Sequence, residues 1–159
     1  MEIKNPYLDI INKNIELGQA EDAICLAKGA GLETECYFML GLPSETEQDI
    51  RKTIDFAIKL NPDYAKFAIT IPLPGTQLFD SVQAAGKILT RDWDKYSFAG
   101  SLRDIYVHDS LTWEQIENYY HLSHKKFYFR MDYVLRMAYN SLTKGLFLDH
   151  CKAFLKTKW

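Results

Sequence analysis

The chain has few side chains whose types and spacing would suit catalysis or metal binding. Its three cysteines, Cys25, Cys36 and Cys151, lie far apart and form no C-x-x-C or C-x-x-x-C motif, so they predict neither a zinc site nor an iron–sulfur cluster. One closely spaced histidine pair, His121 and His124, lacks a nearby carboxylate or cysteine. No acid–base pair or nucleophile triad is recognisable. We therefore expect no metal ligands and assign no catalytic residue.

Glycine and proline follow two apolar runs, and this pattern indicates a possible ligand site. Gly-Leu-Pro at 41–43 ends one run, and Pro-Leu-Pro-Gly at 72–75 ends another. In parallel α/β folds, ligands bind at the carboxyl ends of strands. Gly41 would let a flat ligand approach the backbone, because glycine has no side chain. Ordinary tight turns between strand and helix explain the same residues equally well.

The elements that would position these turns follow the order helix, strand, helix, strand, helix. The expected helices cover 19–28, 44–60 and 76–85, and the expected strands cover Thr34–Leu40 and Tyr64–Ile71. Ser44 and Thr46 are alternative N-caps for the second helix. Two strands joined by a helix form a right-handed crossover, which makes them parallel.

The remaining chain has a different character. Arg103–His108 could add one more strand, and helices are expected at 113–130, 132–144 and Leu146–Lys156. The fold class is therefore α/β, with parallel strands and crossover helices followed by a helical C-terminal part.

The second expected strand has one apolar and one polar face. Ala65, Phe67 and Ile69 alternate with Tyr64 and Lys66. Parallel sheets are normally apolar on both faces, and burying an unpaired lysine would be costly. The pattern therefore predicts a barrel or cleft whose interior is wet or holds a ligand.

Composition, net charge and cysteine content exclude several classes of protein. The chain is 47% hydrophobic with a formal net charge of -2, typical of one globular domain and unfavourable for a nucleic-acid binder. No apolar run approaches the length of a membrane span. An odd number of cysteines and no recognisable signal peptide indicate a cytoplasmic, reduced protein.

Longer motifs resemble the radical S-adenosylmethionine (radical SAM) superfamily, within it the cobalamin-binding-type branch that includes anaerobic cyclase-like enzymes. The resemblance lies in residues 12–15, in FMLGLPSETEQDIRKTIDFA at 38–57 and in NPDYAKFAITIPLPGTQLF at 61–79, and it continues in residues 93–96, 111–116 and 125–136. It implies the C-terminal part of a partial (β/α) barrel over 1–110 and a helical extension over 111–159. In that family a [4Fe-4S] cluster binds SAM and cleaves it to a 5′-deoxyadenosyl radical.

The resemblance also implies binding residues. Tyr37, Met39 and Gly41 match the family's G-x-I-x-G strand, which packs on the adenine, although tyrosine and methionine replace its glycine and isoleucine. Glu45 follows Gly41 as in the branch's G-L-P-G-E-T. The strand ending at Thr70–Pro72 matches one whose end contacts the adenosyl group.

Part of the family pattern has no counterpart in this chain. The C-x-x-x-C-x-x-C loop that holds the cluster does not occur. Two or three parallel strands would also leave unpaired edges, which the rest of a barrel would cover. We therefore expect a C-terminal portion of a larger enzyme, inactive alone, whose partner is the remainder of the barrel. A truncated reading frame, an expressed fragment and a split subunit remain open, as do the substrate and cobalamin binding.

A different class of function is also consistent with the sequence. From Leu111 onward there are 8 Lys+Arg against 4 Asp+Glu, a balance of +4. A non-catalytic binding or scaffold domain could use these basic, aromatic helices to hold an acidic partner, with Lys125, Lys126, Arg130 and Arg136 as the contact residues.

Overall fold

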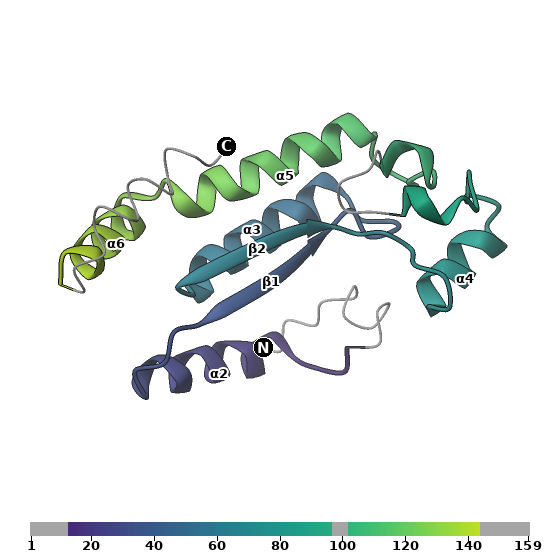
Figure 1. Ribbon diagram of the computed structural model, residues 1–159. Coiled ribbons are helices and arrows are strands. Elements are labelled where there is room, and N and C mark those ends of the chain that lie inside the picture. The colour runs from purple at the N-terminus through teal and green to yellow at the C-terminus, as the bar shows by residue number, and fades with distance from the viewer. Residues whose placement is uncertain (1–12, 97–101, 144–159) are drawn as a thin grey trace.

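The computed structural model describes residues 13–96 and 102–143, which form a mixed α/β fold (Figure 1). The elements in chain order are α2 (Leu17–Gly29), β1 (Glu35–Leu40), α3 (Glu47–Leu60), β2 (Tyr64–Ile69), α4 (Gln77–Ala84), the 3-10 turns η1 (Trp93–Lys95) and η2 (Leu102–Asp104), α5 (Trp113–Tyr128) and α6 (Met131–Thr143). The predicted alternation of helices and strands is confirmed. The expected helix at Leu146–Lys156 lies outside the described residues.

The two strands pair in parallel, as predicted, with Glu35 opposite Tyr64 and Leu40 opposite Ile69. One face of this sheet packs against α3 and α5, which lie together on the same side in Figure 1. Phe38 and Phe67 stack on that face with their ring centroids 5.3 Å apart. Among residues 13–96 and 102–143, the hydrophobic effect therefore holds the sheet to helices on one face.

Capping residues define both ends of α3. Thr46 is the N-cap: its hydroxyl accepts from the backbone N–H of Asp49, whose carboxylate accepts from the N–H of Thr46. Of the two alternatives, Ser44 is wrong, because it adopts a left-handed backbone with φ 66° and its hydroxyl bonds Asp109 instead. Asn61 ends the helix in the left-handed region, just before Pro62.

The helical C-terminal part shares a core with the sheet. Ile116, Tyr119 and Phe127 of α5 and Tyr133 of α6 belong to the same cluster of buried side chains as Phe38. The division at residues 110 and 111 stays a prediction. Within the described residues, the two parts are joined by this common core.

The expected strand at Arg103–His108 is wrong. The segment begins with η2 and makes one isolated antiparallel bridge, between Tyr106 and Ile88. Ile105 and Tyr106 are consecutive and both buried, so the segment lacks the alternation of a half-covered strand. It brings the Tyr106 hydroxyl to the carbonyls of Gly41 and Thr70, which follow β1 and β2.

The outer helices are more loosely attached. α2 has no buried residue and contacts the α3 end through an ion pair between Glu21 and Lys59, 2.6 Å apart. In α4 the buried residues are Phe79 and Val82, and Ala85, which follows the helix, is exposed. Within the described residues, no helix is both long and apolar enough to cross a membrane.

Candidate functional site

The carboxyl ends of β1 and β2 lie side by side, as the sequence predicted. The N–H of Thr70 donates to the carbonyl of Leu40 at 2.8 Å, which continues the ladder past the last strand residues. The hydroxyl of Tyr106 lies 3.0 Å from the Gly41 carbonyl and 3.4 Å from the Thr70 carbonyl. One buried tyrosine thus joins the two strand ends.

Gly41 occupies a position that only glycine adopts without strain. Its φ is 74°, in the left-handed region. A Cβ at this position would lie 3.2 Å from Cγ2 of Ile116, which comes from α5. Backbone conformation and packing against α5 are therefore sufficient reasons for this glycine. Its approach to a ligand stays a prediction.

Glu45 lies beneath the Gly-Leu-Pro turn. It is only 1% exposed, and its Oε2 accepts from the N–H groups of Gly41 at 2.6 Å and Leu42 at 3.0 Å. Burial raises the pKa of Glu45 to about 7, against the lowering effect of these two hydrogen bonds. Among the described residues its contacts are with the turn, so the geometry makes Glu45 a support of the turn.

His108 holds the same turn from another side. Its Nε2 lies 2.8 Å from the carbonyl of Leu42, and its Nδ1 accepts from the N–H groups of Ser110 and Leu111. This pattern requires the neutral ring with the proton on Nε2. Burial, the largest influence, lowers the pKa of His108. Neither Tyr106 nor His108 was predicted from the sequence as part of this site, because neither belongs to a local motif.

In the part of the chain that the structure describes, the side chains on the other face of the sheet are largely exposed. Tyr37 is 68% exposed and Met39 is 40% exposed, both on β1. Lys66 on β2 pairs with Glu35 at 3.0 Å, and its ammonium lies 5.2 Å from the ring centre of Tyr37. The polar face that the sequence predicted to be wet is thus the uncovered face. Tyr37 and Met39 lie along this face in the direction of the strand ends at Gly41 and Thr70.

Thr70 and Pro72 lie at the end of the second strand. Both are buried, and in the part of the chain that the structure describes, the Thr70 hydroxyl has no hydrogen-bond partner. A buried hydroxyl without a partner is unusual, because leaving one unpaired costs about 1–3 kcal/mol. The Thr70 hydroxyl could therefore accept a polar contact from a group that the described residues do not provide.

A small cleft opens beside the turn, with a volume of about 260 Å³. Pro43 and Ser44 of the turn line one side, and Leu78 and Val82 of α4 line another. The Asp109 carboxylate binds both the Ser44 hydroxyl and the Lys87 ammonium at its rim. These contacts link the turn to the segment that follows α4.

The donor set of the described residues does not fit a metal cluster. Cys25 is exposed on α2, and Cys36 is partly buried on β1. No three His, Cys, Asp or Glu side chains among residues 13–96 and 102–143 come close enough to hold a metal ion. His124 instead contacts the Tyr120 carbonyl at 2.9 Å. Cys151 lies outside the described residues.

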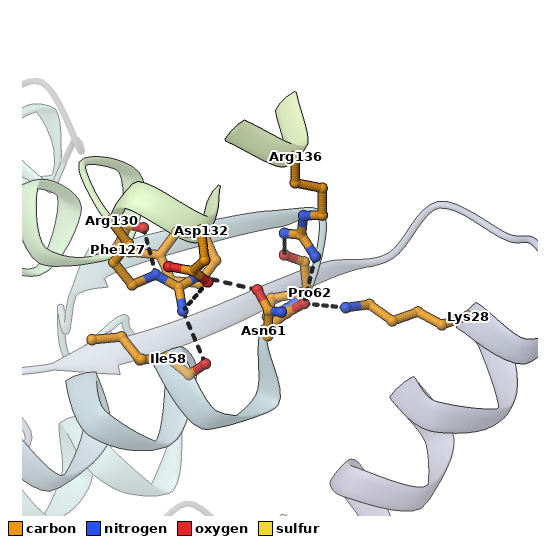
Figure 2. A network of polar contacts seen from close by, with 8 residues as sticks. All are labelled: Lys28, Ile58, Asn61, Pro62, Phe127, Arg130, Asp132 and Arg136. Atoms are coloured by element: carbon orange, nitrogen blue, oxygen red, sulfur yellow. Dashed lines mark hydrogen bonds and ion pairs between the residues drawn. The ribbon is translucent and has the colours of Figure 1, made fainter. Parts of the chain in front are cut away.

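Two arginines expected to face a partner have intramolecular contacts (Figure 2). Arg130 donates to the carbonyls of Phe127 and Ile58, and Arg136 donates to that of Pro62. Lys125 and Lys126 are exposed. The proposed acidic partner stays a prediction that rests on these two lysines.

Comparison with known proteins relates the chain to methyltransferases and cyclases. It is 37% identical over 123 residues to an uncharacterized methyltransferase of Pyrococcus horikoshii, covering 77% of this chain and 26% of that protein. It is 36% identical over 91 residues to the anaerobic magnesium-protoporphyrin IX monomethyl ester cyclase of Rubrivivax gelatinosus, covering 57% of this chain and 16% of the cyclase. The expected likeness to cyclase-like enzymes agrees with this similarity.

A third relative extends the similarity further along the chain. The bacteriochlorophyllide d C-8(2)-methyltransferase of Chlorobaculum tepidum is 28% identical over 130 residues, covering 80% of this chain and 29% of that enzyme. The chain thus spans less than a third of the length of each of these relatives. No family model matches it.

Proposed function

We propose that this chain forms the C-terminal part of a partial (β/α) barrel of the radical SAM type, in the cobalamin-binding-type branch. In this proposal it provides one wall for the adenosyl part of SAM. The observation that best supports this proposal concerns the sheet of the described residues. There α3 and α5 cover one face, while Tyr37, Met39 and Lys66 are exposed on the other, beside the joined strand ends.

The uncovered face supports a barrel. Parallel strands are normally buried on both faces and joined to neighbours on both edges. Here β1 and β2 form a two-stranded sheet among the described residues, with Tyr64, Tyr37 and Met39 exposed on one face. Further parallel strands would pair with the edges and turn this face inward. The remainder of the barrel is therefore the proposed partner.

The strand ends fit an adenosyl group. Met39 presents an apolar side chain on the open face, which suits the flat surface of a purine. Thr70, across from Gly41, carries the buried hydroxyl without a partner. Tyr37, Met39, Gly41, Thr70 and Pro72 are the proposed wall. Glu45 acts as a positioning residue for Gly41 in this proposal, because its carboxylate faces the turn from beneath.

The described residues do not fit the cluster, because no three possible ligands among them come together. The [4Fe-4S] cluster would therefore be held by the remainder of the barrel, and no residue here is assigned to it. Residues 1–110 would belong to the barrel, and residues 111–159 to a helical extension packed against it. The named relatives, methyltransferases and cyclases, support an enzyme of this class.

Anaerobic reconstitution with iron and sulfide tests the proposal. The chain alone should bind no stoichiometric cluster and cleave no SAM. Mixing it with the polypeptide that carries the C-x-x-x-C-x-x-C loop of the same enzyme should restore both, measured by visible absorption and by 5′-deoxyadenosine formation. Cluster binding together with SAM cleavage by the chain alone would contradict the proposal that the remainder of the barrel holds the cluster.

The wall is tested separately in the reconstituted mixture. Met39→Asp places a charge on the open face and should weaken SAM binding at least tenfold. Leu26→Asp, at a position 74% exposed on α2, is the matched control and should leave the affinity unchanged. Equal SAM affinities of Met39→Asp and the unsubstituted chain would contradict the proposed adenosyl wall.

A further inference from the structure

The two strands of the sheet each have an outer edge, the edge that faces away from the other strand. In a parallel pair, the N–H and C=O of one residue point to the same side, and successive residues alternate. The N–H of Tyr64 donates to the carbonyl of Thr34 at 2.9 Å, and that of Thr70 donates to Leu40 at 2.8 Å. Even-numbered residues therefore bond across the pair. The odd-numbered residues direct their backbone groups to the outer edges, and they are Glu35, Tyr37 and Met39 on β1 and Ala65, Phe67 and Ile69 on β2.

A tyrosine hydroxyl occupies the outer edge of β2. Tyr128, the last residue of α5, accepts from the N–H of Ala65 at 3.1 Å and donates to the carbonyl of the same residue at 2.7 Å. A neighbouring strand would need the same two groups for its own backbone hydrogen bonds. Burial raises the pKa of Tyr128, so the phenol keeps the proton that it donates. Tyr128 therefore closes the edge of β2 at Ala65.

The edge of β2 is also covered on either side of this contact. α5 packs against β2 and runs beside it in Figure 1. Ala65 is 1% exposed and Phe67 is 4% exposed, and fractions this small include the backbone groups as well as the side chains. The Phe67 ring contacts His124 and Phe127 of α5, with ring centroids 5.2 and 6.3 Å apart. A strand added at this edge would have to displace the end of α5 from β2.

The outer edge of β1 has a different character in the part of the chain that the structure describes. Glu35, Tyr37 and Met39 are all exposed, and the sheet of these described residues ends at β1. Proteins commonly protect an exposed edge with proline, lysine or a bulge. β1 contains neither proline nor lysine, and its register with β2 runs without a bulge from Glu35 to Leu40. The chain thus protects one edge of its sheet and leaves the other able to pair.

We propose that β1 is the docking edge for a further β-strand, and that Tyr128 makes β2 the terminal strand of the sheet. The occupant of the β1 edge is a parallel strand from the remainder of the barrel. It would bond the backbone groups of Glu35, Tyr37 and Met39, as in the addition of a strand to a sheet edge. The identity of this occupant rests on the proposed function, whereas the difference between the two edges does not. The proposal narrows the contact with the remainder of the barrel to one edge.

Amide hydrogen exchange of the full chain, resolved by residue with NMR, tests the closed edge. The N–H of Ala65 should exchange at least tenfold more slowly than those of Tyr37 and Met39, each relative to its rate in the unfolded chain. Equal exchange at the three positions would overturn the proposal, because the two edges would then be equally accessible.

Tyr128→Phe tests the role of the hydroxyl, since it keeps the ring. Protection of Ala65 should fall at least tenfold, while Thr70, which donates to Leu40, should keep its protection. Tyr119→Phe is the matched control, because its hydroxyl, on the same helix, donates to Glu47 at 2.7 Å. It should leave Ala65 unchanged. Equal losses at Ala65 in both variants would contradict a specific cap by Tyr128.

The docking edge is tested in a mixture with the polypeptide that carries the C-x-x-x-C-x-x-C loop of the same enzyme. Tyr37 and Met39 should gain at least tenfold protection from exchange, while Phe67 and Ile69 should gain none. Tyr37→Pro removes an outward N–H and leaves the bonds to β2 in place, so it should weaken association with that polypeptide at least tenfold. Tyr37→Val, which keeps the N–H, is the matched control. Analytical ultracentrifugation measures both affinities.

The outcomes separate this inference from the proposed function. Protection gained at Phe67 and Ile69 instead of Tyr37 and Met39, in a mixture that cleaves SAM, would overturn the inference and leave the proposed function standing. Absence of any complex would contradict both the proposed function and the occupant. Protection of Tyr37 and Met39 in the chain alone, together with sedimentation as a dimer, would show that a second copy occupies the edge and would overturn the proposal.

Discussion

The carboxylate of Glu45 accepts a hydrogen bond from the backbone N–H of Gly41 across 2.6 Å. The same oxygen, Oε2, also accepts from Leu42, so Oε1 takes no part in either bond. A proton on Oε1 would therefore leave both contacts in place. Since burial raises the pKa of Glu45 to about 7, this strand-end turn is joined to a group that titrates near neutral pH.

The free energy of unfolding should include a contribution from Glu45 that falls as pH rises from 4.5 to about 7. The folded pKa lies above the ordinary value, so the folded state binds more protons in this window and deprotonation favours unfolding. The size is on the order of 3 kcal/mol, from about 1.4 kcal/mol for each pKa unit. Urea titrations across this pH range measure it.

Glu45→Gln should remove this contribution while keeping an oxygen that can accept from Gly41 and Leu42. Glu45→Ala should instead destabilise the chain by about 1–3 kcal/mol at low pH, because two buried N–H groups lose their partner. Glu114→Gln, at an exposed position, is the control and should keep the original slope. An unchanged slope in Glu45→Gln would contradict the assignment.

Gly41→Ala should destabilise the chain more than Gly75→Ala. Both glycines have positive φ, 74° and 80°, so both substitutions incur a conformational cost of about 1–2 kcal/mol. At Gly41 the new Cβ also meets Ile116 at 3.2 Å, whereas at Gly75 it meets no atom within 4 Å. Thermal and urea unfolding of the two variants compare these effects. Equal losses would mean that contact with α5 does not constrain the turn.

His108 should contribute the opposite pH dependence. Burial lowers its pKa below the ordinary value of 6.5, so the folded state binds fewer protons there. Stability should fall as pH drops below 6.5 toward the folded pKa, since protonation favours the unfolded chain. This slope should be measured in the Glu45→Gln background, because Glu45 titrates in an overlapping window. His108→Gln should flatten it, and His121→Gln, at an exposed position, should not.

Arg130→Lys should destabilise the chain by about 1–3 kcal/mol, although the charge is kept. The guanidinium donates to the carbonyls of Phe127 and Ile58 and to the side chain of Asn61, a set that one ammonium cannot reproduce (Figure 2). Arg51→Lys is the matched control, because the Arg51 side chain is 54% exposed and its ion pair should contribute below about 1 kcal/mol. Urea midpoints compare the two. Similar small losses would mean that the cluster does not stabilise the α3 end.

Local sequence determined much of this fold. The alternation of Ala65 and Phe67 with Lys66 correctly predicted a strand with one covered face, because side-chain direction along a strand depends only on neighbouring residues. The end of α3 at Asn61 and Pro62 was predictable for the same reason, since proline restricts the residue before it. The parallel pairing followed from the crossover helix between the strands.

Tertiary structure alone decided how the strand ends are held. Tyr106 reaches Gly41 across 65 residues of sequence, and His108 reaches Leu42 across 66. No period or motif encodes such contacts, because they depend on the path of the intervening chain. The choice of Thr46 over Ser44 as the cap of α3 was also tertiary, since Asp109 binds Ser44. Glu45 was recognisable from the sequence, but its place beneath the turn came from the packing of distant segments around it.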